Sequence, residues 1–323
     1  MYVYTMIKHS LVCLLKDDKN ASFKTVRASS SPTLEKVREI YYKNVEVLQY
    51  ILTYCHENSI KSLRVSSSLF PLCTYLPYRE MLAPLLDEVG KEYAKVNYYD
   101  IELSAHPDQF ILLSSLNPGI NANSRYELDV YAKMRQYIPW DLINIHGGSK
   151  AQGFDIHCAI LKEQVKLLSQ DVRQILSLEN DEKSYSFLET LQLAEENKLM
   201  IVPDFHHERC FQKRKENNGE SLSVDDHAQW NKTIDQVIYD NMDRVLATYE
   251  NKSANPTFHI SSPISGWNGN FKDHCKHADY ISSDDYPHYL HEIAKEKNVT
   301  IRLDVEAKAK NEAIFALANS LTV

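Results

Sequence analysis

The chain has 323 residues and a formal charge of −8, because 36 Lys and Arg face 44 Asp and Glu. Hydrophobic residues make up 43% and aromatic residues 10%, which are ordinary globular values and exclude collagen-like, coiled-coil and wholly disordered chains. The acidic total also argues against nucleic-acid binding through bulk charge, so such a partner would require local Lys and Arg or bound metal ions.

Membrane and secretory signals are missing from the sequence. The longest apolar runs, at 10–15 and 199–203, are far shorter than the ~20 residues of a membrane span. The first residues lack the basic segment and sustained apolar core of a signal peptide. The six cysteines are scattered without a CxxC pair, so neither a disulfide framework nor a cysteine-zinc site is expected. We expect a cytoplasmic protein with no membrane partner.

Short β-branched or apolar runs alternate with longer segments of helical spacing. The short runs predict strands at 10–15, 62–66, 100–105, 142–145, 175–178, 200–203, 257–260 and 300–305. The longer segments predict helices near 34–57, 79–95, 122–137, 157–173, 186–197, 226–249, 284–297 and 310–320. In the second of these, the apolar residues from Met81 to Val89 form the stripe of a core-facing helix.

Eight βα units in a chain of this length match an α/β protein built as a single (β/α)8 TIM barrel. No linker or low-complexity tract divides the chain, so one domain covering 1–323 is expected. A doubly wound open sheet is the alternative, but the count of eight favours the barrel. No GxGxxG or GxxxxGK[ST] motif follows any strand, which removes the main support for a nucleotide-binding fold.

A metal-binding type of side chain stands at or just beyond the end of six strand runs. In chain order these are His106, His146, Glu179, Asp204, His259 and Glu306. The carboxyl ends of barrel strands converge on one face, where the active site lies. Six such groups in one bowl would repel one another or lack partners unless divalent cations shared them. Imidazole and carboxylate donors without a thiolate suit Mn, Zn or Fe.

Two further histidines extend the set, His207 in a D-x-x-H spacing from Asp204, and His277 beyond the seventh strand. Eight candidate ligands predict a site of two or three metals at the C-terminal face of the strands. Metals about 3.5–4 Å apart are the recurring arrangement for phosphodiester cleavage. Glu179, at mid-barrel, is the natural bridge because its two oxygens can serve two ions.

Each of these residues also has a structural interpretation. A single histidine is more often hydrogen-bonded in a core or on a surface than bound to a metal, Glu179 could join a salt bridge, and Glu306 could pair with Lys308. The joint pattern at strand ends favours a metal cluster. The histidines that fall in helical segments are interpreted as surface residues, and these are His56, His157, His227, His288 and His291. The role of His9 is left open.

A series of short motifs lies along residues 8–315, each at one position. They are RVSSSLFPL at 64–72, HPDQF at 106–110, NIHGG at 144–148, LEND at 178–181, KSY at 183–185, DFHH at 204–207, HISSP at 259–263, HADY at 277–280 and EAK at 306–308. In this ordered set the chain resembles the UV-damage endonucleases, TIM-barrel DNA-repair enzymes related to the endonuclease IV-type abasic-site endonucleases.

The resemblance implies a monomeric, metal-dependent repair endonuclease that cuts damaged double-stranded DNA immediately 5′ to UV photoproducts and leaves a 3′-hydroxyl. It implies one ion held by His106, His146 and Glu179, and a second held by Asp204, His259, Glu306 and again Glu179. A third would be held by His207 and His277. Mn²⁺ is the metal implied first, with Zn²⁺ or Mg²⁺ as alternatives. Glu179 and Lys308 are expected to be catalytic, Lys308 through its reach to a phosphate.

The same resemblance places Gln109 and Phe110 as a wedge that fills the duplex where the damaged dinucleotide is pushed out. Phe110 as a simple cap on the barrel mouth is the alternative. Arg64 and Lys150 are expected to reach the DNA backbone, and Tyr185 either to contact DNA or to serve structurally. Lys213-Arg214-Lys215, in the longest predicted loop, is either a basic patch for phosphate or solvated surface.

Two positions depart from the family pattern. Thr257 stands where the family commonly has a lysine that can be carbamylated, and Lys8-His9-Ser10 lacks the usual first-strand tyrosine. Both changes put the lesion preference in doubt. The resemblance begins just after Met6, so Met6 as well as Met1 is a candidate start residue.

Three other functions remain as alternatives. A plain abasic-site endonuclease would share the metals, and its substrate would separate it from a photoproduct enzyme. A sugar isomerase would explain the barrel and the charge, but neither eight ligands nor a Gln-Phe loop tip. A non-catalytic barrel that binds DNA or metal predicts no nicking at any metal concentration.

Overall fold

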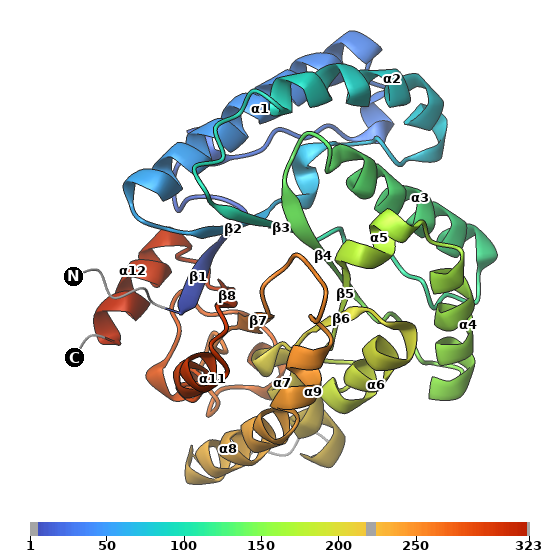
Figure 1. Ribbon diagram of the computed structural model, residues 1–323. Coiled ribbons are helices and arrows are strands. Elements are labelled where there is room, and N and C mark those ends of the chain that lie inside the picture. Colours follow the sequence, from blue (N-terminus) through green and yellow to red (C-terminus); the bar gives the residue numbers. More distant parts are fainter. Residues whose placement is uncertain (1–5, 218–223, 322–323) are drawn as a thin grey trace.

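Eight parallel strands form the centre of the structure, a computed structural model that describes residues 6–217 and 224–321. Helices surround these strands (Figure 1). The strands are β1 Ile7–Val12, β2 Ser62–Val65, β3 Glu102–Ala105, β4 Trp140–His146, β5 Leu176–Glu179, β6 Met200–Val202, β7 Thr257–Ile260 and β8 Ile301–Val305. Their order in the sheet is β6-β5-β4-β3-β2-β1-β8-β7, so neighbours in sequence are neighbours in space, as in a barrel.

The α-helices connect successive strands, and the last one follows β8. They are α1 Leu34–Glu57, α2 Leu76–Tyr93, α3 Pro118–Met134, α4 Phe154–Lys166, α5 Gln170–Ile175, α6 Phe187–Asn197, α7 Phe205–Asn217, α8 Val224–Asp240, α9 Met242–Ala247, α10 Phe271–His274, α11 Leu290–Lys297 and α12 Asn311–Ser320. Short 3₁₀ turns lie at 19–21, 28–30, 67–69 and 283–285. The sequential strand order and the parallel pairing of β1 with β8 confirm the predicted (β/α)8 architecture and reject the doubly wound alternative.

The barrel closes between β6 and β7 through an isolated bridge rather than a ladder. Asp204, two residues beyond β6, forms an isolated parallel bridge with His259 of β7. The His259 N–H donates to the Pro203 carbonyl at 3.0 Å. The residues that close the barrel are therefore two of the predicted metal ligands.

Paired charges fill the amino-terminal end of the barrel. Arg302 is fully buried, and its Nη2 lies 2.7 Å from both Asp141 oxygens and 3.3 Å from Glu102 Oε2. Lys8 pairs with the same Glu102. Buried charges persist when each has a partner, so this network closes the floor of the barrel and leaves the opposite end for the site.

The observed strand limits differ from the prediction mainly at β1. The strand runs over Ile7–Val12 rather than 10–15, because Cys13 adopts a positive φ of 70° and leaves the extended conformation. Leu15 is still buried, but in a loop. Similarly β3 starts at Glu102 rather than at residue 100, because Tyr99 and Asp100 both have positive φ values. The other strands agree within two residues.

Two predicted helices are divided and one is shortened. The segment 157–173 becomes α4 and α5, because Ser169 caps a new helix by accepting the Val172 N–H at 3.3 Å. The segment 226–249 becomes α8 and α9, with Asn241 between them. The segment 284–297 is helical only from Leu290, after a 3₁₀ turn.

Helix α7 was not predicted, because its buried side is polar. Arg209 is fully buried and its guanidinium pairs with Asp235 at 2.6 Å and with Asp285 at 3.1 Å. Lys213, one turn further, is buried with its ammonium 2.6 Å from Asn231 Oδ1. A buried helix face made of paired charges shows no apolar periodicity, so the sequence pattern did not indicate a helix here.

The loop position predicted for 213–215 is consequently wrong, and neither alternative, a phosphate-binding patch or solvated surface, fits the buried Lys213. The three residues lie in α7 rather than in a loop, and Lys213 faces inward with its ammonium 3.6 Å from the centre of the Trp267 ring. Arg214 is exposed, and the side chain of Lys215 lies outside the described residues. Within the described ranges, no helix has the length and apolar character needed to cross a membrane.

His9 gives the fold a predicted pH dependence. Its Nε2 lies 3.1 Å from the Tyr286 hydroxyl, and burial, with repulsion from His291, lowers the pKa of His9 from 6.5 to about 4. Between these values the unfolded chain binds a proton that the folded chain does not, so the free energy of unfolding falls as pH drops from 6.5 towards 4. We expect the free energy of unfolding of His9→Gln to decrease by on the order of 2–3 kcal/mol less over this pH range than that of the unmodified chain.

Urea unfolding between pH 7 and pH 4 measures the effect, with His56→Gln, an exposed histidine on α1, as the control. The same pH slope in His9→Gln and in the unmodified chain would contradict the prediction.

Candidate metal centre

The six strand-end residues lie at the carboxyl ends of their strands as predicted. His106 directly follows β3, His146 ends β4, Glu179 ends β5, Asp204 follows β6, His259 lies in β7 and Glu306 directly follows β8. Because all eight strands are parallel, these ends meet at one face of the barrel.

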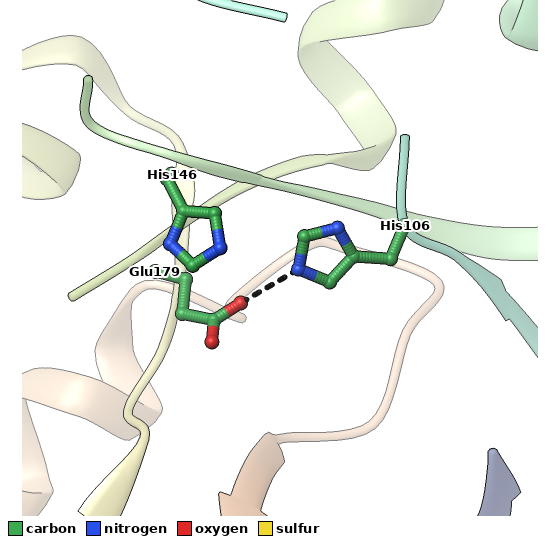
Figure 2. A group of neighbouring side chains, drawn as sticks. All are labelled: His106, His146 and Glu179. Carbon is green, nitrogen blue, oxygen red and sulfur yellow. Dashed lines mark hydrogen bonds and ion pairs between the residues drawn. The ribbon is translucent and has the colours of Figure 1, made fainter. Parts of the chain in front are cut away.

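His106, His146 and Glu179 form the first group. One ligand atom from each lies within 4.8 Å of the others, and Figure 2 shows the three side chains pointing toward one another. The distance from His106 Nε2 to Glu179 Oε2 is 3.0 Å. His146 Nδ1 is buried and has no hydrogen-bond partner among the described residues. An unsatisfied buried nitrogen of this kind is suited to binding a metal.

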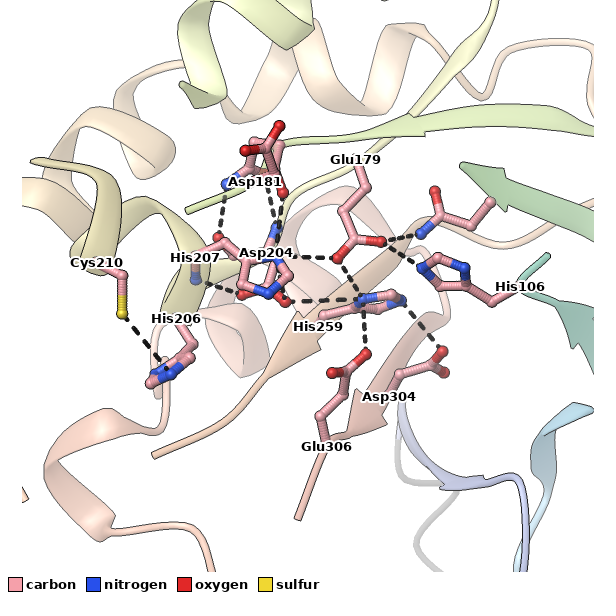
Figure 3. Close-up of polar contacts among 12 residues, drawn as sticks. His106, Glu179, Asp181, Asp204, His206, His207, Cys210, His259, Asp304 and Glu306 are labelled. Atoms are coloured by element: carbon pink, nitrogen blue, oxygen red, sulfur yellow. Dashed lines mark hydrogen bonds and ion pairs between the residues drawn. The ribbon is translucent and has the colours of Figure 1, made fainter. Parts of the chain in front are cut away.

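Glu179, Asp204, His259 and Glu306 form the second group, with ligand atoms again within 4.8 Å of one another. His259 Nδ1 lies 3.1 Å from Glu179 Oε1 and 3.2 Å from Glu306 Oε1 (Figure 3). Glu179 thus belongs to both groups, and it turns Oε2 toward His106 and Oε1 toward His259. This is the arrangement expected of a carboxylate that bridges two ions.

His207 and His277 border the second group. His207 Nδ1 lies 3.2 Å from Glu179 Oε1 and 3.3 Å from Asp204 Oδ2, and His277 Nδ1 lies 3.4 Å from Glu306 Oε2. Asp204 fixes the start of α7 by accepting the His207 N–H at 2.7 Å. His277 is held by a bridge to Pro263. The fold therefore gathers all eight predicted ligands.

Burial and mutual charge shift the pKa values within this cluster. Burial would raise the pKa of Glu179, but His259 and His146 hold it well below its ordinary value, and burial raises the pKa of Asp204 to about 7. Burial would lower the pKa values of His207 and His259, yet the neighbouring carboxylates raise both well above 6.5. Burial lowers the pKa of His146 to about 4 and also lowers the pKa of His277, whereas the carboxylates draw protons onto the nitrogens of His207 and His259. Divalent cations bound to those nitrogens would replace the protons, so the donor set fits such ions.

Two residues that support the ligands were missed from the sequence. Asn144 donates to Glu179 Oε2 and accepts the Ser177 hydroxyl at 2.9 Å. Asp304 lies 3.2 Å from Nε2 of His259. Each stands two residues before a ligand of its own strand, so the two-residue period of strand faces was the signal that could have found both.

Of the three other residues expected at the DNA, Arg64 and Tyr185 are buried and Lys150 is half-buried. Arg64 is buried and pairs with Glu306. Tyr185 is fully buried, and its hydroxyl donates to the Ser149 carbonyl at 3.2 Å, which corresponds to the structural alternative. The Lys150 ammonium is 2.6 Å from Glu189. The burial and pairing of these three side chains depend on neighbours in space that the sequence does not show.

Gln109, Phe110 and Lys308 are exposed, in the loops that follow β3 and β8. Phe110, with 73% of its surface exposed, is not buried as a cap of the barrel would be. The β3 loop is tied to the β2 loop, because the Ser67 hydroxyl donates to Asp108 at 2.8 Å. The Lys308 N–H donates to the Ala278 carbonyl at 2.9 Å, next to His277.

Four of the five histidines interpreted as surface residues have described side chains, and three of these follow the prediction. His56, His288 and His291 are exposed as predicted. His157 is only 3% exposed, with Nδ1 2.6 Å from the Ser114 carbonyl, so its interpretation as a surface residue was wrong. The side chain of His227 lies outside the described residues. Thr257 is buried at the start of β7, and its hydroxyl donates to the Asn255 carbonyl at 2.9 Å.

A parallel barrel with two adjacent His/carboxylate groups that share a glutamate is typical of TIM-barrel enzymes with a candidate metal site at the carboxyl ends of the strands. Within this class, the family model described as UV-endonuclease UvdE matches residues 8–323. The chain therefore belongs to the UV-endonuclease UvdE family, whose activity is that of a phosphodiester hydrolase.

Relatives agree with this family, and solved structures share the fold. The UV DNA damage endonuclease of Bacillus cereus (strain G9842) is 27% identical over 308 residues, which cover 93% of this chain and 87% of the relative. The enzyme of the same name from Nostoc sp. (strain PCC 7120) is 31% identical over 215 residues, or 62% and 64% of the two chains.

The crystal structure of SacUVDE superposes with a TM-score of 0.71 at 21% identity, over 98% of this chain and 99% of that one. Endonuclease IV from Thermus thermophilus shares the fold, with a TM-score of 0.54 at 11% identity over 85% and 94% of the chains.

Replacing the shared carboxylate tests the metal centre. We expect Glu179→Gln to lower the affinity for Mn²⁺ by at least about 100-fold, because a direct ligand of both groups is lost and even indirect supports of metal sites cost 10–100-fold. Metal content per chain after gel filtration, read by elemental mass spectrometry, measures the loss. Glu163→Gln, an exposed carboxylate on α4, is the control. Equal metal content in both variants would show that Glu179 is not a ligand.

Proposed function

We propose that this chain is a metal-dependent DNA-repair endonuclease that hydrolyses the phosphodiester immediately 5′ to UV photoproducts in double-stranded DNA and leaves a 3′-hydroxyl. The observation that carries the proposal is the Glu179 carboxylate, shared by two groups of metal-binding residues at the mouth of a barrel of the UvdE family. Two ions bridged by one carboxylate are the recurring arrangement for displacement at a phosphate.

We assign three divalent ions to the eight ligands. His106 and His146 would hold the first with Glu179, and Asp204, His259 and Glu306 the second, again with Glu179. The third would bind His207 and His277, whose ring centres are 6.3 Å apart. The bound ions would supply a nucleophilic water at neutral pH and positive charge at the phosphate. Mn²⁺ is the proposed metal, with Zn²⁺ or Mg²⁺ as the alternatives for these donors.

The chain's own residues would hold the DNA. Lys308 is exposed two residues beyond Glu306, so its ammonium is placed to bind a phosphate at the site. Gln109 and Phe110 would enter the duplex at the lesion. A flat apolar ring replaces lost stacking, and pushing out a base costs least where pairing is already damaged. The exposure of Phe110 next to the ligand loop of His106 supports this role.

The remaining expectations concern the protein as a whole. A single domain over 1–323 and a monomer acting on one lesion belong to the proposal, together with a cytoplasmic location. The six free cysteines support a reducing compartment.

A nicking assay tests the proposed activity. We expect a duplex with one defined photoproduct to be cut just 5′ to the lesion when Mn²⁺ is present and to stay intact with chelator, because the ligands act through bound ions. A matched undamaged duplex is the control. Cleavage of an abasic duplex alone would assign the chain to the abasic-site endonucleases. No cleavage of any duplex by metal-loaded protein would contradict the proposal.

The wedge is tested by Gln109→Ala combined with Phe110→Ala. We expect the preference for damaged over intact duplex to fall by about 10-fold or more, since stacking on an aromatic ring is worth about 1–3 kcal/mol per base. Binding titrations with both duplexes measure the preference, and metal content should be unchanged. Leu167→Ala, an exposed apolar residue at the far end of α4, is the matched control. An unaltered preference in the double variant would reject the wedge.

A further inference from the structure

Asp304 lies inside the barrel beside His259, and the proposed assignment of ions to ligands gives it no role of its own. It stands on β8 two residues before Glu306, so the two side chains are on the same face of the strand. Only 1% of its surface is exposed. In the pairing of β7 with β8, Asp304 is the register partner of His259. The strand register therefore places this carboxylate beside the His259 ring.

Few groups compensate the charge of Asp304. Its Oδ2 lies 3.2 Å from Nε2 of His259, and the next cation is Arg64, whose Nε is 3.9 Å away. Within the described ranges, neither carboxylate oxygen meets a donor at a hydrogen-bonding angle. A buried carboxylate with so few partners is costly. Its charge is directed mainly at one edge of the His259 ring.

The opposite edge of that ring faces the metal ligands. Nδ1 of His259 lies between the oxygens of Glu179 and Glu306, at 3.1 and 3.2 Å, while Nε2 faces Asp304 (Figure 3). A nitrogen that binds a metal carries no proton, so a neutral ring that binds through Nδ1 must carry its proton on Nε2. A negative charge beside Nε2 favours that tautomer.

We infer that Asp304 is a positioning residue that holds His259 in the Nε2–H tautomer, with the Nδ1 lone pair directed into the group formed by Glu179, Asp204 and Glu306. The inference rests on the proposed metal centre. Asp304 is not a ligand of that group, because the His259 ring separates it from the Nδ1 edge. Carboxylates that orient metal-binding histidines in this way typically contribute 10–100-fold in metal affinity.

The test is Mn²⁺ binding by Asp304→Asn, which keeps the size of the side chain and removes its charge. We expect a 10–100-fold weaker affinity for one ion of the centre, with the affinity at the His106 and His146 group retained, in calorimetric titrations of the full chain. Asp141→Asn is the control, since it also removes a carboxylate from the barrel interior, one that pairs with Arg302 at the far end. Wild-type affinity in Asp304→Asn would overturn the inference.

A second measurement holds even if Asp304→Asn does not fold. In the unmodified chain loaded with Zn²⁺ and labelled with ¹⁵N-histidine, the inference predicts a proton on Nε2 of His259 and none on Nδ1, with the signal assigned by its loss in His259→Gln. A proton on Nδ1 would overturn it. If the unmodified chain binds no divalent ion, the proposed centre fails instead, so the two failures are distinguishable.

Discussion

The arrangement of this protein depends on one buried carboxylate. Glu179 is fully enclosed by the barrel, where an unpaired negative charge would be very unfavourable. The structure compensates it from both sides, with His106 at one oxygen and with His207 and His259 at the other, and Asn144 adds an amide donor. Every one of these groups comes from a different strand or from the segment just after it. The parallel strands of the barrel bring these strand ends to the same carboxylate.

Closure of the barrel and assembly of the ligands are coupled. The last gap in the sheet is bridged by Asp204 and His259 rather than by a regular ladder, and both residues belong to the second group. At the opposite end, the charges around Arg302 are paired within the protein. The barrel thus has one end whose charges balance internally and one end that gathers imidazoles and carboxylates. That asymmetry locates the chemistry at the carboxyl ends of the strands.

The outer part of the centre depends on polar packing around α7. Trp267, in the loop after β7, donates from its indole to Asp285 at 2.7 Å and lies under the Lys213 ammonium. Asp285 also pairs with Arg209 of the same helix. These contacts attach the segment that carries His277 to α7, whose first turn carries His207. Burying charges in this way costs stability unless each has a partner, and here the partners fix the two elements that carry the candidate ligands His207 and His277 relative to each other.

The sequence by itself determined the barrel and the eight residues that gather at its mouth, because both depend on local patterns. Strand and helix periods repeat along the chain, and residues at strand ends follow directly from them. The ordered motifs, which are also local, identified the family. Only the tertiary structure decided which charged side chains face inward. Arg64 pairs with Glu306 across 242 positions, and the polar side of α7 and the buried His157 depend equally on distant neighbours. Burial and pairing of charges are set by residues remote in sequence, so no local pattern predicts them.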